Sequence, residues 1–251
     1  MAQRAVRLYG IPLSHPVLAA RGMLARKRLT YRYVELLAGT HPLSLWALGF
    51  RRPTVPAMKL SDGRGVQGSL AIARALEELV AAPRLYPAQP AARAAAEQAE
   101  RWGERVLQPI PRRLIRWGLR HHLRQRRWFA QVATPLPAPQ AVAVLLTPIV
   151  PIFVRQSGAQ DSNVRRDLAA LPEHLDRVDE LIGRGVIGGH ELGAADFQIG
   201  SSVRALLAYE DVGRLVRGRP AENLALRVAP EYPPIPAALP PQWLPPEAGA
   251  R

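Results

Sequence analysis

The chain changes character near residue 83, and this change restricts its fold more than any other feature of the sequence. Before it, residues 5–10 and 30–36 are short, rich in aromatic and β-branched residues and alternate in polarity, which is typical of strands. Between them, residues 17–28 carry apolar side chains at helical spacing. The pattern predicts a β-α-β unit, in which two parallel strands are joined by a right-handed crossover.

A hairpin and a second helix are expected next. Residues 56–60 and 64–67 flank a Ser-Asp-Gly sequence, and Asp-Gly at a tight turn is a strong hairpin signal. The helix is expected to begin near Ser69 and to turn Glu77 and Glu78 toward water. Its predicted apolar face consists of Ile72, Ala73, Leu76, Leu79 and Val80.

Beyond residue 90 the sequence shows no strand pattern. Residues 83–90 hold three prolines in eight positions and are typical of a linker. Residues 91–129 are rich in Ala, Arg, Leu and Glu, which favour helix, with a break or kink expected at Pro109 and Pro111. Further helices are predicted over 162–183 and 194–208.

An α/β domain followed by an all-helical domain is a restrictive combination. The predicted parts are an α/β domain (1–82), a linker (83–90), a helical domain (91–228) and a tail (229–251). Eight prolines between residues 230 and 246 predict that this tail is extended rather than helical. We expect Tyr232 and Trp243 to pin it to the rest of the molecule.

Composition removes several classes of protein. With 251 residues, 48% of them hydrophobic and 22% charged, the chain is long and apolar enough to bury a core. It has no cysteine, which excludes disulfides, thiolate metal sites, iron–sulfur clusters and a cysteine nucleophile. The apolar stretch 141–154 is too short to span a membrane, and no apolar signal follows Met1, so we expect a soluble cytoplasmic protein.

The net charge of +14 comes almost entirely from arginine. Lys27 and Lys59 are the two lysines, so 32 of the 34 basic residues are arginine. This skew is more simply a compositional bias than a nucleic-acid surface, and we expect neither a nucleic-acid nor a membrane partner. The positive field still favours anionic ligands.

The first candidate site is the sequence Leu13-Ser14-His15-Pro16 at the start of the first helix. Proline suits the first helical turn, which leaves Ser14 at the helix N-terminus. The free N–H groups and the dipole there stabilise an anion and would lower the pKa of a bound thiol, to which the Ser14 hydroxyl would donate. The simpler alternative is that Ser14 only caps the helix.

Two other junctions between loops and regular elements carry candidate ligand groups. A cis Val55–Pro56 bond would turn the Val55 backbone outward to pair with a peptide-like ligand, whereas a trans proline would merely start a strand. Gly68 and Ser69 open the next helix, where free N–H groups and a hydroxyl suit a carboxylate or simply cap the helix. In a thioredoxin-like domain the three sites would converge on one edge.

At these residues the sequence resembles the glutathione S-transferase family, over most of the chain to about residue 228. The LSHP sequence is similar to the serine-type, theta-like members of the family. The motifs that carry the resemblance are LYGIPLSHPVLAARGML (8–24), TVPAMKL (54–60), VQGSLAIARAL (66–76) and LGAADFQIG (192–200). In the last of these, Asp196 is expected to cap a helix inside the helical domain, with Gly193 at the cap position.

The resemblance implies a thioredoxin-like N-terminal domain, a helical-bundle C-terminal domain and a glutathione site. Ser14 would activate the glutathione thiol, the cysteinyl backbone would pair with Val55 beside Pro56, and Ser69 would hold the γ-glutamyl carboxylate. His41 or Arg52 would screen the glycine end. One residue departs from the family pattern. Family members usually have Glu or Gln just before the serine that corresponds to Ser69, and this chain has Gly68 there. Gln67 stands one position earlier, where its side chain would point in a different direction.

The function implied is transfer of glutathione, through its thiolate, to a hydrophobic electrophile bound by the helical domain. No metal is required, and a homodimer is expected by resemblance. The alternatives are a glutathione-transferase-like binding protein with little or no turnover, or a protein that uses a different thiol. The sequence leaves the electrophile and the reaction type open.

Three other features are interpreted as structural. Tyr9 is a competing hydroxyl but is expected to pack within its strand. Adjacent His121 and His122 point about 100° apart on a helix, so they make a poor metal pair.

The third feature is a basic stripe, a row of arginines at helical spacing. We interpret it as a solvated helix face rather than a surface that binds RNA or a membrane. Its positive charge would also attract anionic co-substrates toward a nearby cleft. The stripe consists of Arg112, Arg116, Arg120 and Arg124. The apolar run 139–154 is expected to be core and, by resemblance, also a wall of the electrophile site.

Overall fold

The computed structural model describes residues 6–133, 143–144, 147–148 and 150–245. Its single described sheet has the order β2-β1-β3-β4 and is built from β1 (Val6–Gly10), β2 (Tyr31–Glu35), β3 (Ala57–Lys59) and β4 (Gly65–Gln67). β1 runs parallel to β2 and antiparallel to β3, and β3 and β4 form an antiparallel hairpin. The predicted β-α-β unit and hairpin are therefore confirmed.

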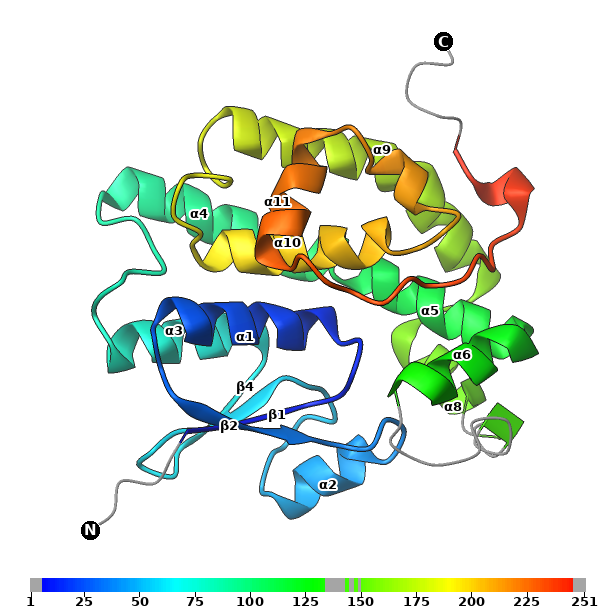
Figure 1. Ribbon diagram of the computed structural model, residues 1–251, viewed down its shortest axis with the longest axis horizontal. Coiled ribbons are helices and arrows are strands. Elements are labelled where there is room, and N and C mark those ends of the chain that lie inside the picture. The colour runs from blue at the N-terminus through cyan, green and yellow to red at the C-terminus, as the bar shows by residue number, and fades with distance from the viewer. Residues whose placement is uncertain (1–5, 134–142, 145–146, 149, 246–251) are drawn as a thin grey trace.

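Helices cover both faces of this sheet (Figure 1). α1 (His15–Arg26) and α3 (Ser69–Leu79) lie on the face toward the helical part of the chain, and α2 (His41–Ala47) lies on the other face. The sequence pattern did not predict α2, which is a short helix whose second residue is a proline. Together these elements form the α/β architecture of the thioredoxin-like type.

One predicted helix face is partly wrong. Ile72, Ala73 and Leu76 are buried as expected, but Leu79 at the end of α3 is 41% exposed. Glu77, which was expected to face water, instead forms an ion pair with Lys27, a residue only 2% exposed. The lysine also donates to the Val80 carbonyl. A buried ammonium group is stable only with such partners. Glu77 therefore turns toward Lys27 instead of toward water, although the helical periodicity predicts an exposed position.

The regular secondary structure in the rest of the described chain is helical apart from one β-bridge. Its elements are α4 (Pro90–Trp102), the π-helical segment η1 (Gly103–Leu107), α5 (Pro109–His121), α6 (Leu123–Ala133), α8 (Val150–Ser157), α9 (Asp161–Gly183), α10 (Ala194–Leu207), the 3-10 turn η2 (Gly213–Leu215), α11 (Pro220–Val228) and the 3-10 turn η3 (Pro241–Trp243). The expected break near Pro109 and Pro111 is present: both prolines lie in the first turn of α5, where a missing N–H is tolerated.

α10 joins the two halves of the molecule. Every residue of this helix is buried, and it packs against α1, α4 and α11. Its Phe197 and Ala194 belong to the hydrophobic cluster of the N-terminal part, whereas Ile199 and Val203 belong to the cluster of the helical part. The predicted cap is confirmed, because the Gly193 N–H donates to the Asp196 carboxylate at 2.8 Å.

The proline-rich tail runs across the helical part to its far side (Figure 1). Up to residue 245 it is extended apart from η3, as expected; Pro246 and later residues lie outside the described part. Ile235 forms a β-bridge with Tyr209. Both predicted anchors are confirmed: the Tyr232 hydroxyl donates to the Leu13 carbonyl at 2.6 Å, and the Trp243 ring lies 5.2 Å from that of Trp117.

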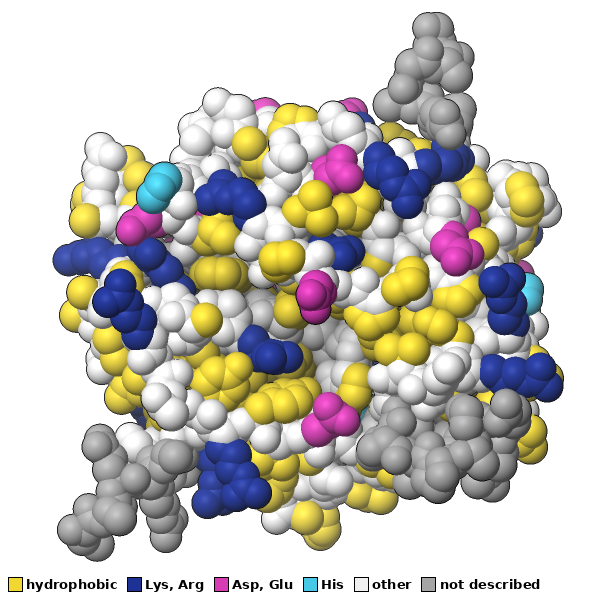
Figure 2. All heavy atoms as spheres, in the orientation of Figure 1, with side chains coloured by type: hydrophobic (Ala, Val, Ile, Leu, Met, Phe, Trp, Pro, Cys, Tyr) yellow, Lys and Arg dark blue, Asp and Glu magenta, His cyan; other side chains and the backbone are white. Residues whose placement is uncertain are grey.

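In the view of Figure 2, basic side chains are interspersed with acidic and apolar ones and do not gather into a single basic face. Within the described ranges, no helix is both long and apolar enough to cross a bilayer.

The seating of α10 on α1 depends on a close approach at Gly22. A Cβ placed on this residue would lie 2.5 Å from the Phe197 ring. We expect Gly22→Ala to lower the free energy of unfolding by about 1–3 kcal/mol, because the packed ring must move. Urea denaturation measures this change.

Gly183→Ala is the matched control, since a Cβ there at the end of α9 meets no atom within 4 Å. It should leave stability unchanged or raise it slightly, because alanine favours helix. Equal stability of the two variants would contradict the packing between α1 and α10.

Candidate functional site

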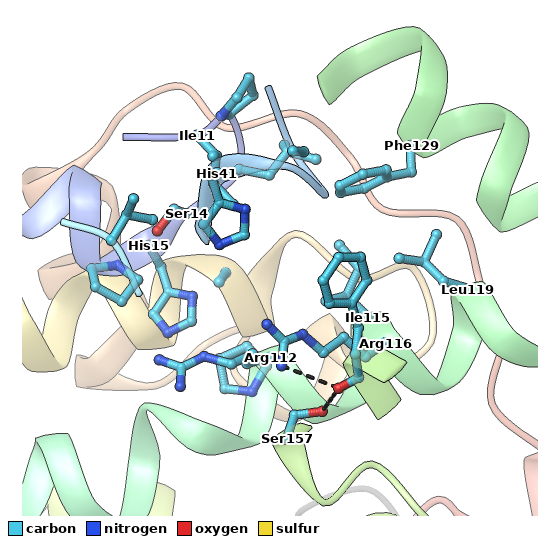
Figure 3. Close-up of a pocket in the computed structure, with 18 of the residues that line it drawn as sticks. Ile11, Ser14, His15, His41, Arg112, Ile115, Arg116, Leu119, Phe129 and Ser157 are labelled. Carbon is cyan, nitrogen blue, oxygen red and sulfur yellow. Dashed lines mark hydrogen bonds between the residues drawn. The ribbon is translucent and has the colours of Figure 1, made fainter. Parts of the chain in front are cut away.

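A cavity of about 410 Å³ opens where the two halves of the molecule meet. This volume lies within the range of small-molecule sites. One wall comes from the turn before α1, the start of α2 and the loop 53–55. The other wall comes from α5, α6, α8, the end of α10 and the tail. The site therefore combines the α/β part with apolar helices from the second half (Figure 3).

Ser14 stands at the mouth of α1 and lines this cavity. It occupies the N-cap position with extended backbone angles (φ −80°, ψ 102°), yet its side chain makes no capping hydrogen bond. The simple interpretation of Ser14 as a helix cap is therefore not supported. Figure 3 draws its hydroxyl among the side chains of the cavity.

The turn that presents Ser14 is held from the far end of the chain. Leu13 adopts a left-handed conformation (φ 62°), which costs a branched residue on the order of 1 kcal/mol or more. The Tyr232 hydroxyl donates to the Leu13 carbonyl, and Tyr232 also lines the cavity. The tail thus fixes the backbone next to the serine, a contact that no local sequence pattern could reveal.

His41 and Val55 line the same cavity. The Val55–Pro56 peptide bond is cis. His41 is 7% exposed at the start of α2, and burial, reinforced by the charge of Arg116, lowers its pKa to about 4. The imidazole is therefore neutral at physiological pH, and its Nδ1 has no hydrogen-bond partner among the described residues.

Four other candidates lie outside the residues that line the cavity: Arg52, Pro56, Gln67 and Ser69. The Gln67 amide is used internally, since it accepts from the Arg52 N–H at 3.0 Å and donates to the carbonyls of Arg52 and Thr54. It therefore braces the loop that leads to Val55. Gly68 has a left-handed backbone (φ 96°), and a Cβ there would meet only the Arg52 guanidinium, at 3.9 Å.

Ser69 is only 2% exposed and its hydroxyl donates to the Gln198 amide oxygen at 3.0 Å. The Gln198 amide nitrogen in turn donates to the carboxylate of Glu100 in α4. Burial raises the pKa of Glu100 to about 7, although the Arg74 guanidinium beside it opposes the shift. This network ties the start of α3 to the helical half, so the Ser69 hydroxyl has an internal partner.

Two features interpreted as structural, Tyr9 and His121, pack against other aromatic rings. Tyr9 is buried edge-on against Phe50, with ring centroids 5.7 Å apart. The His121 ring stacks on Trp117 at 4.4 Å. In the portions of the chain that the structure describes, no cluster of three His, Cys, Asp or Glu side chains is suited to a metal ion.

Arg112 and Arg116 are the site residues that sequence reasoning missed. Both were assigned to a solvated stripe, but they line the cavity, whereas Arg120 and Arg124 are exposed as expected. The sequence did contain a signal for this. Ile115 is a neighbour of both arginines on the helix surface, so Arg112 and Arg116 share a helix face with an apolar residue, which is unusual for a fully solvated face. The interpretation was thus wrong for the half of the stripe that faces the cavity.

The two cavity arginines are held with few contacts. Arg112 donates to the Gln108 side chain at 3.2 Å. Arg116 donates to the Phe153 carbonyl at 3.3 Å, a bond that Figure 3 draws as a dashed line. Burial lowers the pKa of both guanidiniums, that of Arg116 to about 10 with a contribution from the charge of Arg112. Both remain cationic at neutral pH and give the cavity a positive potential.

The apolar run 139–154 lies partly outside the described residues, which lack 139–142, 145–146 and 149. Within the described part, Val150 is buried in the core of the helical half and also lines the cavity. Phe153 lines the cavity as well. This segment is therefore both core and wall, as expected.

His15 crosses between the halves next to Ser14. Its Nε2 donates to the Gln108 carbonyl at 3.1 Å, and burial together with the Arg112 charge lowers its pKa to about 3. Between about pH 6.5 and pH 3, His15 is therefore mostly protonated in the unfolded chain and mostly neutral in the folded chain. The His15 contribution to stability is complete above that pH and is lost as the pH falls toward 3.

We expect acidification from pH 7 to pH 4 to cost on the order of 2–3 kcal/mol of stability through His15. His15→Gln keeps an N–H donor for the Gln108 carbonyl but has no group that titrates in this range. Acidification should therefore cost the variant about 2–3 kcal/mol less stability than it costs the unmodified protein. Urea unfolding at several pH values measures the difference. His190→Gln, at an exposed position, is the control; parallel curves for His15→Gln and the unmodified protein would contradict the assignment.

Comparison with known proteins adds to this geometry. Residues 8–84 match the family model for the glutathione S-transferase N-terminal domain. A search of curated protein sequences found no match to the chain.

The whole chain is similar to solved glutathione transferase structures. One from Rhodospirillum rubrum is 23% identical, with a TM-score of 0.56, and the match covers 92% of this chain and 95% of that one. One from Phanerochaete chrysosporium is 19% identical, with a TM-score of 0.62 and coverage of 92% and 99%. One from Sinorhizobium meliloti is 17% identical, with a TM-score of 0.61 and coverage of 91% and 89%. At these identities the likeness shows the fold.

Proposed function

Because residues 8–84 belong to the glutathione S-transferase N-terminal domain family and the whole chain has the glutathione S-transferase fold, we propose that this protein transfers glutathione to a hydrophobic electrophile. The observation that carries the proposal is the Ser14 hydroxyl, which makes no capping bond and lines a cavity shared with apolar helices. The electrophile would bind among those helices.

Ser14 would act on the thiol. Its hydroxyl donates a hydrogen bond to the sulfur, and this bond is stronger when the sulfur is a thiolate. The N-terminus of α1 also favours the anion, so the pKa of the bound thiol falls. The thiolate then attacks the electrophilic carbon, a carbon–sulfur bond forms, and the leaving group departs with its electron pair or, in an addition, a proton is taken from solvent.

The remaining candidates would position the tripeptide. The Val55 backbone, beside the cis bond to Pro56, would pair with the cysteinyl unit, while His41 or Arg52 would screen the glycine end. Ser69 would hold the γ-glutamyl carboxylate, chiefly through its backbone N–H, because its hydroxyl already donates to Gln198. Gln67 would act indirectly by bracing the loop before Val55.

A second candidate function is ligand binding with little turnover, or use of a different thiol. Two observations favour it. Gly68 offers no side chain to the γ-glutamyl amino group, and the Gln67 amide cannot replace it because it is bound to the Arg52–Thr54 backbone. A missing charge-assisted contact would cost on the order of 1.5–3 kcal/mol of affinity.

In either case we propose a cytoplasmic homodimer that requires no metal. The charge pattern does not call for a nucleic-acid or membrane partner, because two of the four arginines in the basic stripe face the cavity.

Ser14→Ala tests the catalytic proposal. We expect kcat/KM for conjugation of glutathione with an activated aryl halide to fall about 10- to 100-fold, the value of a hydrogen bond to a charged group, and its pH profile to shift to higher pH. Calorimetry should show glutathione binding that is nearly unchanged.

Ser157→Ala is the control, because Ser157 lines the same cavity but donates to a carbonyl of its own helix, that of Phe153. It should retain activity. If the unmodified protein binds glutathione but shows no turnover, the binding function is favoured. If it shows neither glutathione binding nor turnover, the glutathione proposal is wrong.

A further inference from the structure

We propose that the second substrate carries a carboxylate, which Arg112 and Arg116 bind while its apolar body lies against the helical wall of the cavity. Both arginines come from α5, one turn apart, and both line the cavity that Ser14 enters from the opposite half of the molecule (Figure 3). The inference names the substrate class of the proposed function; its anion-binding part does not depend on turnover.

The first argument is the number of unused donors. A guanidinium has five N–H donors. Among the residues that the structure describes, the Arg112 guanidinium donates one hydrogen bond, to Gln108, and that of Arg116 donates one, to the Phe153 carbonyl. Both bonds are long for charged donors, at 3.2 and 3.3 Å. Most of the donors of the pair are therefore left for a ligand.

The second argument is the missing counter-charge. Within the described residues, no Asp or Glu lines the cavity, and neither arginine has a carboxylate within ion-pair distance. The charge of Glu104 acts on Arg112 but only partly offsets the effect of burial on its pKa. The neighbouring Arg113 shows the contrast, because it binds the Asp167 carboxylate through two nitrogens. Two adjacent cations out of bulk water repel each other and are costly, and burial lowers the pKa of both. An anion removes that cost.

The third argument is the shape of the recognition. The planar fork of a guanidinium matches a carboxylate, which accepts two parallel hydrogen bonds from it. The surrounding wall is apolar, with Ile115, Leu119 and Phe129 near the arginines. A largely apolar wall that carries a pair of cations selects an amphipathic acid over a neutral hydrophobic compound or a free inorganic anion.

A carboxylate of glutathione itself is the competing source of the same chemistry. We commit to the second substrate because both arginines stand on α5 beside apolar side chains of α5, α6 and α8. The groups proposed for the tripeptide stand on the other half of the molecule, at Val55, Ser69 and either His41 or Arg52. The charge of Arg116 acts on His41, so the glycine end of the tripeptide is the place where the competing carboxylate would bind. The test therefore measures both substrates.

The first experiment is calorimetry of the full chain with cinnamate and with cinnamamide, in the absence of glutathione. We expect cinnamate to bind about tenfold or more tightly than the amide, in line with hydrogen bonds to a charged group. The double variant R112Q/R116Q should lose this preference. R120Q, the same change one turn further along α5 at an exposed position, should keep it. Equal binding of acid and amide by the unmodified protein would overturn the inference.

The second experiment compares conjugation of para-chloro-meta-nitrobenzoate with that of the corresponding benzamide. The glutathione thiolate attacks the ring carbon that bears chlorine, the carbon–sulfur bond forms, and chloride leaves. We expect R112Q/R116Q to raise the KM of the benzoate about tenfold, with the KM of glutathione and of the benzamide unchanged. A rise in the KM of glutathione alone would overturn the inference and assign the arginines to the tripeptide.

The two experiments separate failure of the inference from failure of the proposed function. A preference for cinnamate that R112Q/R116Q removes, without any conjugation, supports the anion site and refutes the transferase. Conjugation that does not discriminate between benzoate and benzamide supports the transferase and refutes the anion site. Thermal unfolding of each variant shows that a loss of binding is not a loss of fold.

Discussion

The contact between α1 and α10 is the constraint on which the rest of the structure depends. The apolar residues of α1 share one hydrophobic cluster with those of β1 and β3, and α1 also packs against α10, a helix whose residues are all buried. Phe197 fills the space left by Gly22, so the two halves pack as closely as the interior of one domain. The N-terminus of α1 is thereby carried to the edge of this contact, where the cavity opens.

The arrangement gives the cavity two unlike walls. The α/β wall offers polar groups at the ends of regular elements, with Ser14 and the Val55 backbone as the main ones. The helical wall offers apolar surface and two cations. A reaction between a polar thiol compound and a mostly apolar acid would need such a division, since each reactant meets a wall of its own polarity.

Much of the fold could be predicted from the sequence because local signals agreed with it. The β-α-β unit, the Asp-Gly hairpin and the helix break near Pro109 follow from short-range rules, and the structure contains them. The errors have non-local causes: Lys27 buries its ammonium against Glu77, and Ser69 turns its hydroxyl to Gln198. The partners lie 50 and 129 residues away along the chain, beyond any periodicity.

The site was predicted in part for the same reason. Ser14, His41 and Val55 sit at junctions that sequence patterns mark, and they share the cavity. Arg112 and Arg116 belong to a regular basic stripe, in which spacing alone does not distinguish the arginines that meet the cavity from those that meet water. The Tyr232 bond to Leu13 joins opposite ends of the chain, so only the folded structure could reveal it.

A crystal structure of the protein with bound glutathione tests the central claim most directly. The account predicts that the glutathione sulfur lies within hydrogen-bonding distance of the Ser14 hydroxyl and faces the apolar helices across the cavity. Glutathione bound with its sulfur turned away from Ser14 would contradict it.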